Sequence, residues 1–78
     1  GKLYLFQGFS TTAIKYYKLA YSKNKMDPNI LDELAVAYSK LNEYEQAINY
    51  ENDAISLDKS VPEYFLNRGY FYLKNNSS

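Results

Sequence analysis

Acidic side chains are the residues of this sequence best suited to chemistry, because they can act as general acids, general bases or metal ligands. Asp32 and Glu33 are adjacent, so on a helix they point about 100° apart and do not form a catalytic pair. Asp53 and Asp58 are five residues apart and lack the oxygen-rich loop that a calcium site needs. We therefore expect these carboxylates to lie on solvated helix surfaces and to bind no metal.

Hydroxyl groups offer no better catalytic site. The chain contains no histidine to activate a serine and no cysteine to act as a thiol nucleophile. Its three glycines are isolated from one another, so no glycine-rich loop could hold a phosphate. The sequence therefore predicts a protein that is not an enzyme and that uses no cofactor.

The composition describes one small domain with an uneven charge distribution. The chain has 78 residues, 46% of them hydrophobic, with nine basic and nine acidic side chains. Residues 1–26 contain five lysines and no acid, whereas residues 27–63 contain all nine acids. A general nucleic-acid binder is usually more basic than this, and no apolar run is long enough to cross a membrane. The missing cysteine and the missing signal-peptide pattern are compatible with a cytosolic protein.

Apolar residues recur three and four positions apart, which is typical of amphipathic helices. Four stretches follow this spacing, at residues 10–23, 29–41, 43–57 and 61–74. No stretch alternates with a period of two. The spacing therefore predicts an all-α fold with about four helices.

The chain also resembles itself when it is shifted along its own length by one fixed offset, the distance from Ala13 to Ala47. Further matches at the same offset are Tyr16 and Tyr50, Ala20 and Ala54, Pro28 and Pro62, and Tyr38 and Tyr72. Matches that skip over unrelated residues at one offset indicate an internal repeat, and we call this offset the repeat length.

Residues typical of helix ends separate the predicted helices. Asp27 is expected to cap the helix that begins at Pro28, and Ser60 and Glu63 are expected to form a capping box. Gly8 and Asn42 stand at equivalent places, where we expect a left-handed turn between two helices. The spacing thus predicts that residues 3–6 are the last part of a helix. A turn and a new helix are expected to follow them.

On these residues the chain resembles the tetratricopeptide repeat family, whose unit is a pair of antiparallel helices. The matching positions of the complete unit are Leu31, Leu34, Ala35, Tyr38, Tyr44, Ala47 and Ala54; Tyr4, Gly8, Ala13, Tyr17 and Ala20 match in the preceding half-unit, and Phe65, Gly69 and Tyr72 in the following one. The resemblance implies a right-handed α-α superhelix, a solenoid of helical hairpins. Residues 1–27 would be a partial first repeat, residues 28–61 a complete repeat, and residues 62–78 the first helix of a third repeat followed by a frayed tail. The chain would then be a fragment of a longer array.

Two residues depart from the family pattern. Glu51 stands where the family usually has an aromatic side chain, and Arg68 stands where leucine is usual. Because these helices would be neighbours, we expect either a Glu51–Arg68 ion pair between repeats or two side chains that reach solvent independently.

The resemblance implies a concave groove that binds a segment of a partner protein. Its lining residues would be Asn29, Asp32, Glu33, Val36 and Lys40 from one helix, and Glu63, Leu66, Asn67, Tyr70 and Lys74 from the next. The acids and apolar side chains of this set predict a basic, partly apolar peptide as partner. One subfamily instead binds acidic chaperone tails, but Asp32 would repel a carboxylate, so we expect no such binding here.

Two alternative functions stay open at this stage. Apolar surface at the repeat ends would favour self-association into homo-oligomers, since about three repeats are usually needed for a stable solenoid. Helical-hairpin repeats can also bind single-stranded RNA. Two aromatic clusters next to lysines could stack on bases: Tyr16 and Tyr17, and Tyr70, Phe71 and Tyr72. The acidic complete repeat argues against RNA.

Overall fold

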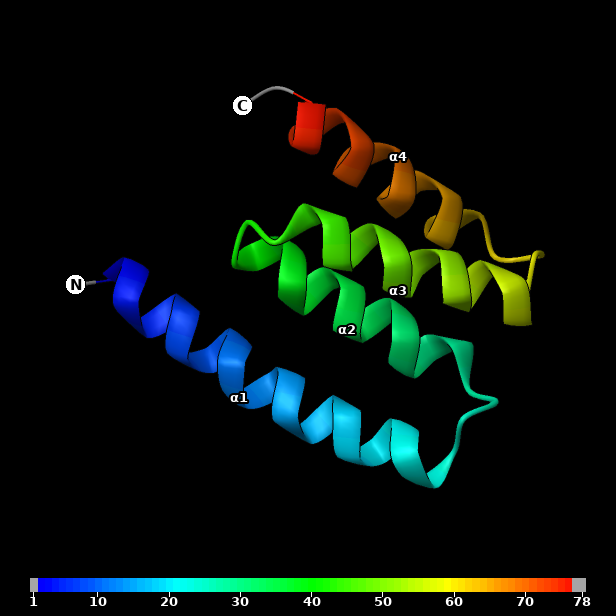
Figure 1. Cartoon of the computed structure of the whole chain (residues 1–78), viewed down its shortest axis with the longest axis horizontal. Helices are drawn as coiled ribbons and strands as arrows, with labels where there is room; N and C mark the ends of the chain where they lie inside the picture. The colour runs from blue at the N-terminus through cyan, green and yellow to red at the C-terminus, as the bar shows by residue number, and fades with distance from the viewer. Residues whose placement is uncertain (1, 77–78) are drawn as a thin grey trace.

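The structure, a computed structural model, describes the backbone of residues 2–76 and the side chains of residues 9–76. This part of the chain consists of four α-helices and no strand: α1 (Lys2–Lys23), α2 (Pro28–Lys40), α3 (Tyr44–Leu57) and α4 (Pro62–Asn76) (Figure 1). The predicted all-α fold is therefore confirmed. None of these helices is both long enough and apolar enough to span a membrane.

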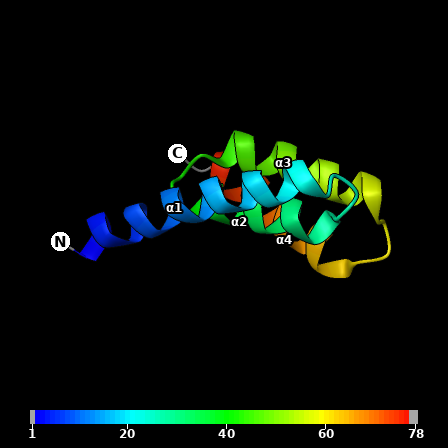
Figure 2. The same cartoon turned by 90° about the horizontal axis from the view of Figure 1, so that it is seen from below.

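The four helices form a flat stack in which consecutive helices run antiparallel (Figure 1). The principal extents of the stack are 38 × 31 × 16 Å. Helix α2 packs against α1 and α3, and α4 packs against α3. Seen from below, α2 and α4 lie toward one face of the stack while α1 and α3 lie toward the other (Figure 2).

Most of the predicted helix boundaries have a visible cause. Oδ1 of Asp27 accepts a hydrogen bond of 3.0 Å from the backbone N–H of Asn29, so Asp27 caps α2 as expected. Asn42 has a φ of 62°, and this left-handed residue turns the chain between α2 and α3 as predicted. The predicted capping box is wrong, because the Ser60 hydroxyl donates to Oδ1 of Asp58 at 2.6 Å and α4 begins later, at Pro62.

The predicted turn at Gly8 is also wrong, because α1 continues through it as one helix of 22 residues. Neither Gly8 nor any other glycine in residues 2–76 has a positive φ. Glycine permits a left-handed turn but can also stay within a helix, as it does here. The side chain of Tyr4, which supported the predicted repeat, lies outside the described residues.

The frayed tail, which the sequence predicts at residues 74–78, begins too early. Residues 74–76 belong to α4, which ends at Asn76, while Ser77 and Ser78 lie outside the described residues.

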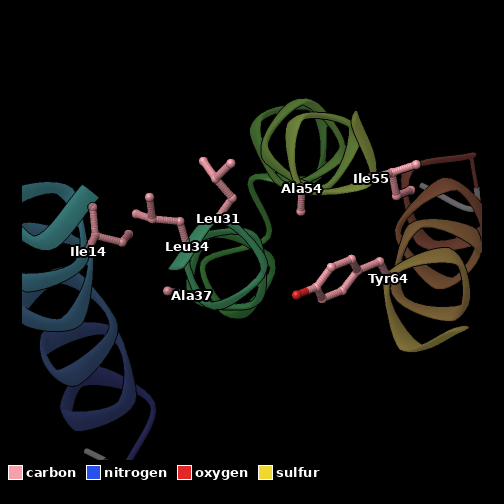
Figure 3. Packing of buried hydrophobic residues seen from close by; sticks show 7 residues of the cluster. All are labelled: Ile14, Leu31, Leu34, Ala37, Ala54, Ile55 and Tyr64. Atoms are coloured by element: carbon pink, nitrogen blue, oxygen red, sulfur yellow. The ribbon is translucent and has the colours of Figure 1, made fainter. Parts of the chain in front are cut away.

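Two adjoining clusters of apolar side chains make up the core. The larger cluster contains Ile14, Leu31, Leu34, Ala37, Ala54, Ile55 and Tyr64, drawn from all four helices. In Figure 3, Ile14 and Leu34 point toward each other across α1 and α2, and the Tyr64 ring points from α4 toward α2. The smaller cluster contains Ala35, Ala47, Ile48 and Phe71.

Small residues let the backbones of α2 and α3 approach closely. Ala35, Ala47 and Ala54 are all 0% exposed. Beside them the rings of Tyr38 and Tyr50 stack with centroids 5.4 Å apart, and Nζ of Lys18 in α1 lies 5.6 Å from the centre of the Tyr38 ring.

Candidate functional site

The ten residues predicted to line a groove all lie on α2 and α4, the two helices that share one face of the stack. None of the ten is buried. We call this surface, formed by Asn29, Asp32, Glu33, Val36, Lys40, Glu63, Leu66, Asn67, Tyr70 and Lys74, the α2–α4 surface. Its role in binding stays a prediction.

One hydrogen bond joins the two halves of the α2–α4 surface. Nδ2 of Asn67 in α4 donates to Oδ1 of Asp32 in α2 at 3.0 Å. The bond connects two helices that are separated in sequence by the whole of α3. It therefore fixes the spacing of the side chains on either side of it.

Apolar side chains lie exposed on the α4 half of this surface. Leu66 is 71% exposed and Tyr70 is 53% exposed. Nζ of Lys74 lies 5.9 Å from the centre of the Tyr70 ring, within range of a cation–π interaction. Val36 supplies a half-buried apolar group on α2.

A hollow of about 320 Å³ opens between α1 and α2, and we call it the α1–α2 groove. It is lined by Phe9, Ser10, Ala13 and Tyr17 from α1 and by Glu33, Val36, Ala37 and Lys40 from α2. The sequence predicted only the polar and valine side chains of α2 as lining residues. The contribution of α1 was missed because the resemblance placed the groove only on the first helices of successive units.

A tyrosine and a glutamate connect the two sides of the α1–α2 groove. The hydroxyl of Tyr17 donates to Oε2 of Glu33 at 3.3 Å. Burial raises the pKa of the Tyr17 phenol, and the Glu33 carboxylate raises it further. The phenol therefore stays protonated and able to donate this hydrogen bond.

Glu51 of α3 lies fully buried beneath the α2–α4 surface. Neither of its carboxyl oxygens has a hydrogen-bond partner among the described residues. Burial raises the pKa of Glu51 to about 9, with a further contribution from Asp32. The carboxyl group is therefore protonated at neutral pH and adds no charge to the surface above it.

The predicted Glu51–Arg68 ion pair does not form. Nη1 of Arg68 instead donates to Oδ1 of Asn52 at 2.9 Å, and the guanidinium lies 5.4 Å from the centre of the Phe65 ring. Arg68 lowers the pKa of Glu51 only slightly compared with the effect of burial. Arg68 is half-buried. The alternative, in which both side chains reach solvent, is wrong for Glu51, whose side chain is 0% exposed.

The described residues contain no group of three or more acidic side chains placed to hold a metal ion. The geometry thus offers an exposed, partly apolar surface together with the α1–α2 groove.

Comparison with known families identifies the family of the central part of the chain. Residues 28–61 match the family model described as Tetratricopeptide repeat. These residues form a tetratricopeptide repeat. Searches of curated proteins and of solved structures return no match.

The tetratricopeptide repeat comprises α2, the turn at Asn42 and α3. Within the repeat, α3 covers the apolar side of α2. The opposite, acidic side of α2 is therefore not covered by α3. Helices α1 and α4 flank the repeat, and Tyr17 of α1 stands one repeat length before Glu51 of α3.

Proposed function

We propose that this chain is a non-catalytic protein-interaction module that binds a segment of a partner protein along the α2–α4 surface. Tetratricopeptide repeats generally mediate protein–protein interactions, which supports the broad assignment. The observation that carries the specific proposal is the Asn67–Asp32 hydrogen bond, which holds α2 and α4 in register beneath the exposed Leu66 and Tyr70. Apolar side chains exposed on a fixed frame are suited to anchor a partner.

The charges on this surface favour one orientation of a basic partner. Asp32, Glu33 and Glu63 lie in the first half of their helices, whereas Lys40 and Lys74 lie in the last turn of theirs. A segment with an apolar centre would place its basic residues over the acids and its less basic end beside the lysines.

Backbone chemical-shift mapping of the 78-residue chain tests this proposal with two peptides. One peptide places lysines and arginines before a leucine-rich centre, and the other replaces those basic residues by glutamate. We expect the basic peptide to shift the amide signals of α2 and α4 and the acidic peptide to shift them far less. Shifts confined to α1 and α3 would contradict the proposal.

A pair of matched variants separates the surface from a general apolar effect. Tyr70→Ser removes an exposed anchor of the α2–α4 surface, and we expect roughly tenfold weaker binding of the basic peptide. Leu19→Ser removes an exposed apolar side chain of α1 and should leave the affinity unchanged. Equal losses in both variants, or salt-sensitive binding of single-stranded RNA in place of the peptide, would overturn the proposed function.

A further inference from the structure

Two apolar faces at opposite ends of the stack have no helix packed on them in the described part of the chain. On α4 the face consists of Phe65, Gly69 and Tyr72, and the two aromatic residues are 42% and 46% exposed. On α1 the face consists of Ala13, Tyr16 and Ala20, and Tyr16 is 70% exposed. We call these the α4 end face and the α1 end face.

The internal repeat supplies the partner for each end face. Phe65, Gly69 and Tyr72 stand one repeat length after Leu31, Ala35 and Tyr38 of α2. Ala13, Tyr16 and Ala20 stand one repeat length before Ala47, Tyr50 and Ala54 of α3. Within the tetratricopeptide repeat these two sets pack on each other, since Ala35, Ala47 and Ala54 are 0% exposed. The two end faces therefore carry the two halves of one helix–helix contact.

We propose that copies of this chain associate head to tail, with the α4 end face of one copy packed on the α1 end face of the next. The contact reproduces in trans the packing of α2 on α3. Tyr72 of one copy stacks on Tyr16 of the next, as Tyr38 stacks on Tyr50 at 5.4 Å. Gly69 lies against Ala13, as Ala35 lies against Ala47.

The α1–α2 groove fits the same arrangement. Helix α2 contacts α4 as well as α3. In the equivalent arrangement one repeat earlier in the stack, a helix that precedes α1 would contact both α1 and α2. That helix would lie over the α1–α2 groove. The incoming α4 is that helix, and it covers Ala13 on one side and Val36 on the other.

The charge distribution selects this pairing over a symmetric one. Residues 1–26 carry five lysines and no acid, so two α1 end faces brought together would repel each other. In the head-to-tail arrangement, α1 of one copy instead lies against α4 of its neighbour, where Glu63 accompanies Arg68 and Lys74. A second copy of this chain therefore complements the shape of the end faces and avoids the contact between two lysine-rich helices.

Sedimentation velocity across a dilution series, from low micromolar to millimolar protein, tests the association. We expect the sedimentation coefficient of the unaltered chain to increase with concentration, because a head-to-tail contact does not close on itself. A coefficient that stays at the monomer value over the whole range would overturn the proposal.

Gly69 offers a variant that separates association from folding. A Cβ added at Gly69 would meet no atom within 4 Å, so the isolated chain accepts a side chain there. We expect Gly69→Gln to keep the helix content while abolishing the increase in sedimentation coefficient, because the side chain would clash with Ala13 of the next copy. Gly69→Ala is the matched control, since Ala35 occupies the equivalent place in α2, and it should still associate. Unchanged association of Gly69→Gln would contradict the proposed contact.

A mixing experiment shows whether the contact joins two different faces. Ala13→Gln blocks the α1 end face and Gly69→Gln blocks the α4 end face, so each variant alone should stay monomeric. Mixed together they should form a one-to-one dimer through the two remaining intact faces. If the Ala13→Gln variant loses helix content, the Tyr16→Lys variant takes its place in the experiment, because it alters an exposed residue of the same face. A mixture that stays monomeric, or either variant forming dimers alone, would overturn head-to-tail packing. No peptide is present in these experiments, so their outcome does not depend on the proposed binding of a partner segment.

Discussion

Glu51 and Tyr17 occupy equivalent positions of the repeat, but their side chains meet different surroundings. Tyr17 lines an open groove and donates its proton to Glu33 in a hydrogen bond. Glu51 is enclosed by neighbouring helices, and its oxygens have no hydrogen-bond partner among the described residues. An unpaired buried carboxyl is costly when charged, so the fold keeps it protonated.

The buried carboxyl makes the stability of the chain depend on pH. The pKa of Glu51 rises from 4.5 to about 9 on folding, so the unfolded state loses its proton first as the pH increases. This contribution to stability is complete below pH 4.5 and is lost progressively as the pH rises to about 9. We expect Glu51→Gln to flatten the pH profile of urea denaturation and to raise the free energy of unfolding at pH 7 by about 3 kcal/mol. Asp53→Asn, which alters an exposed acid of α3, should leave the profile unchanged; an equal effect would contradict this prediction.

Sequence reasoning could single out Glu51 and Arg68 as departures from the family pattern but could not assign their surroundings, and it left open whether both side chains reach solvent. Whether Arg68 reaches Glu51 or Asn52 depends on the direction of its side chain along α4, which spacing does not determine. The same limit applies to the Asn67–Asp32 hydrogen bond, since both residues were predicted on the groove but not in contact.

Gly8 and Asn42 show how the surrounding elements decide the outcome of similar turn signals. Asn42 adopts a left-handed conformation because helices on both sides of it pack against each other. Gly8 instead stays helical, because α1 continues on both sides of it. Glycine permits a turn but does not require one.

This difference predicts opposite effects of alanine at the two positions. Asn42→Ala should lower the free energy of unfolding by about 1 kcal/mol, because alanine is strained at a positive φ. Gly8→Ala should raise it by about 0.5–1 kcal/mol, because glycine is unfavourable inside a helix. Thermal denaturation followed by circular dichroism measures both changes. A loss of stability in Gly8→Ala would instead indicate the left-handed turn that the sequence suggested.

The number and the order of the helices follow from their apolar spacing, whereas the length of α1 does not. The helical period and the capping residues, such as Asp27, depend on interactions between residues that are close together in the sequence. Both can therefore be recognised from the sequence itself. The end of a helix at Gly8 depends on whether another helix packs nearby. The α1–α2 groove depends on how α1 packs on α2, which the spacing of residues does not determine.

Across the whole molecule, charge and apolar end faces are arranged along the direction in which the helices stack. Basic α1 stands at one end of the stack, and α4 with its exposed aromatic residues stands at the other (Figure 1). A repeat contacts only its neighbours along the stack, so each added neighbour contributes stability mainly through the shared contact.

Head-to-tail association therefore predicts a melting temperature that rises with protein concentration. The associated chain covers both end faces, and the free chain leaves them in water. We expect this dependence in the unaltered chain and in Gly69→Ala, and its loss in Gly69→Gln, measured by calorimetry at several concentrations. If the melting temperature of the unaltered chain does not change with protein concentration, the prediction is contradicted.

The stacked Tyr38 and Tyr50 rings give this tryptophan-free chain a built-in optical reporter. Two aromatic rings held at an interplanar angle of 11° form a fixed chiral pair, which contributes to the near-ultraviolet circular dichroism band of tyrosine. Lys18 of α1 lies over one of these rings, so undocking α1 alters the same band. Separation of α1 from the central hairpin can thus be followed without attaching any dye.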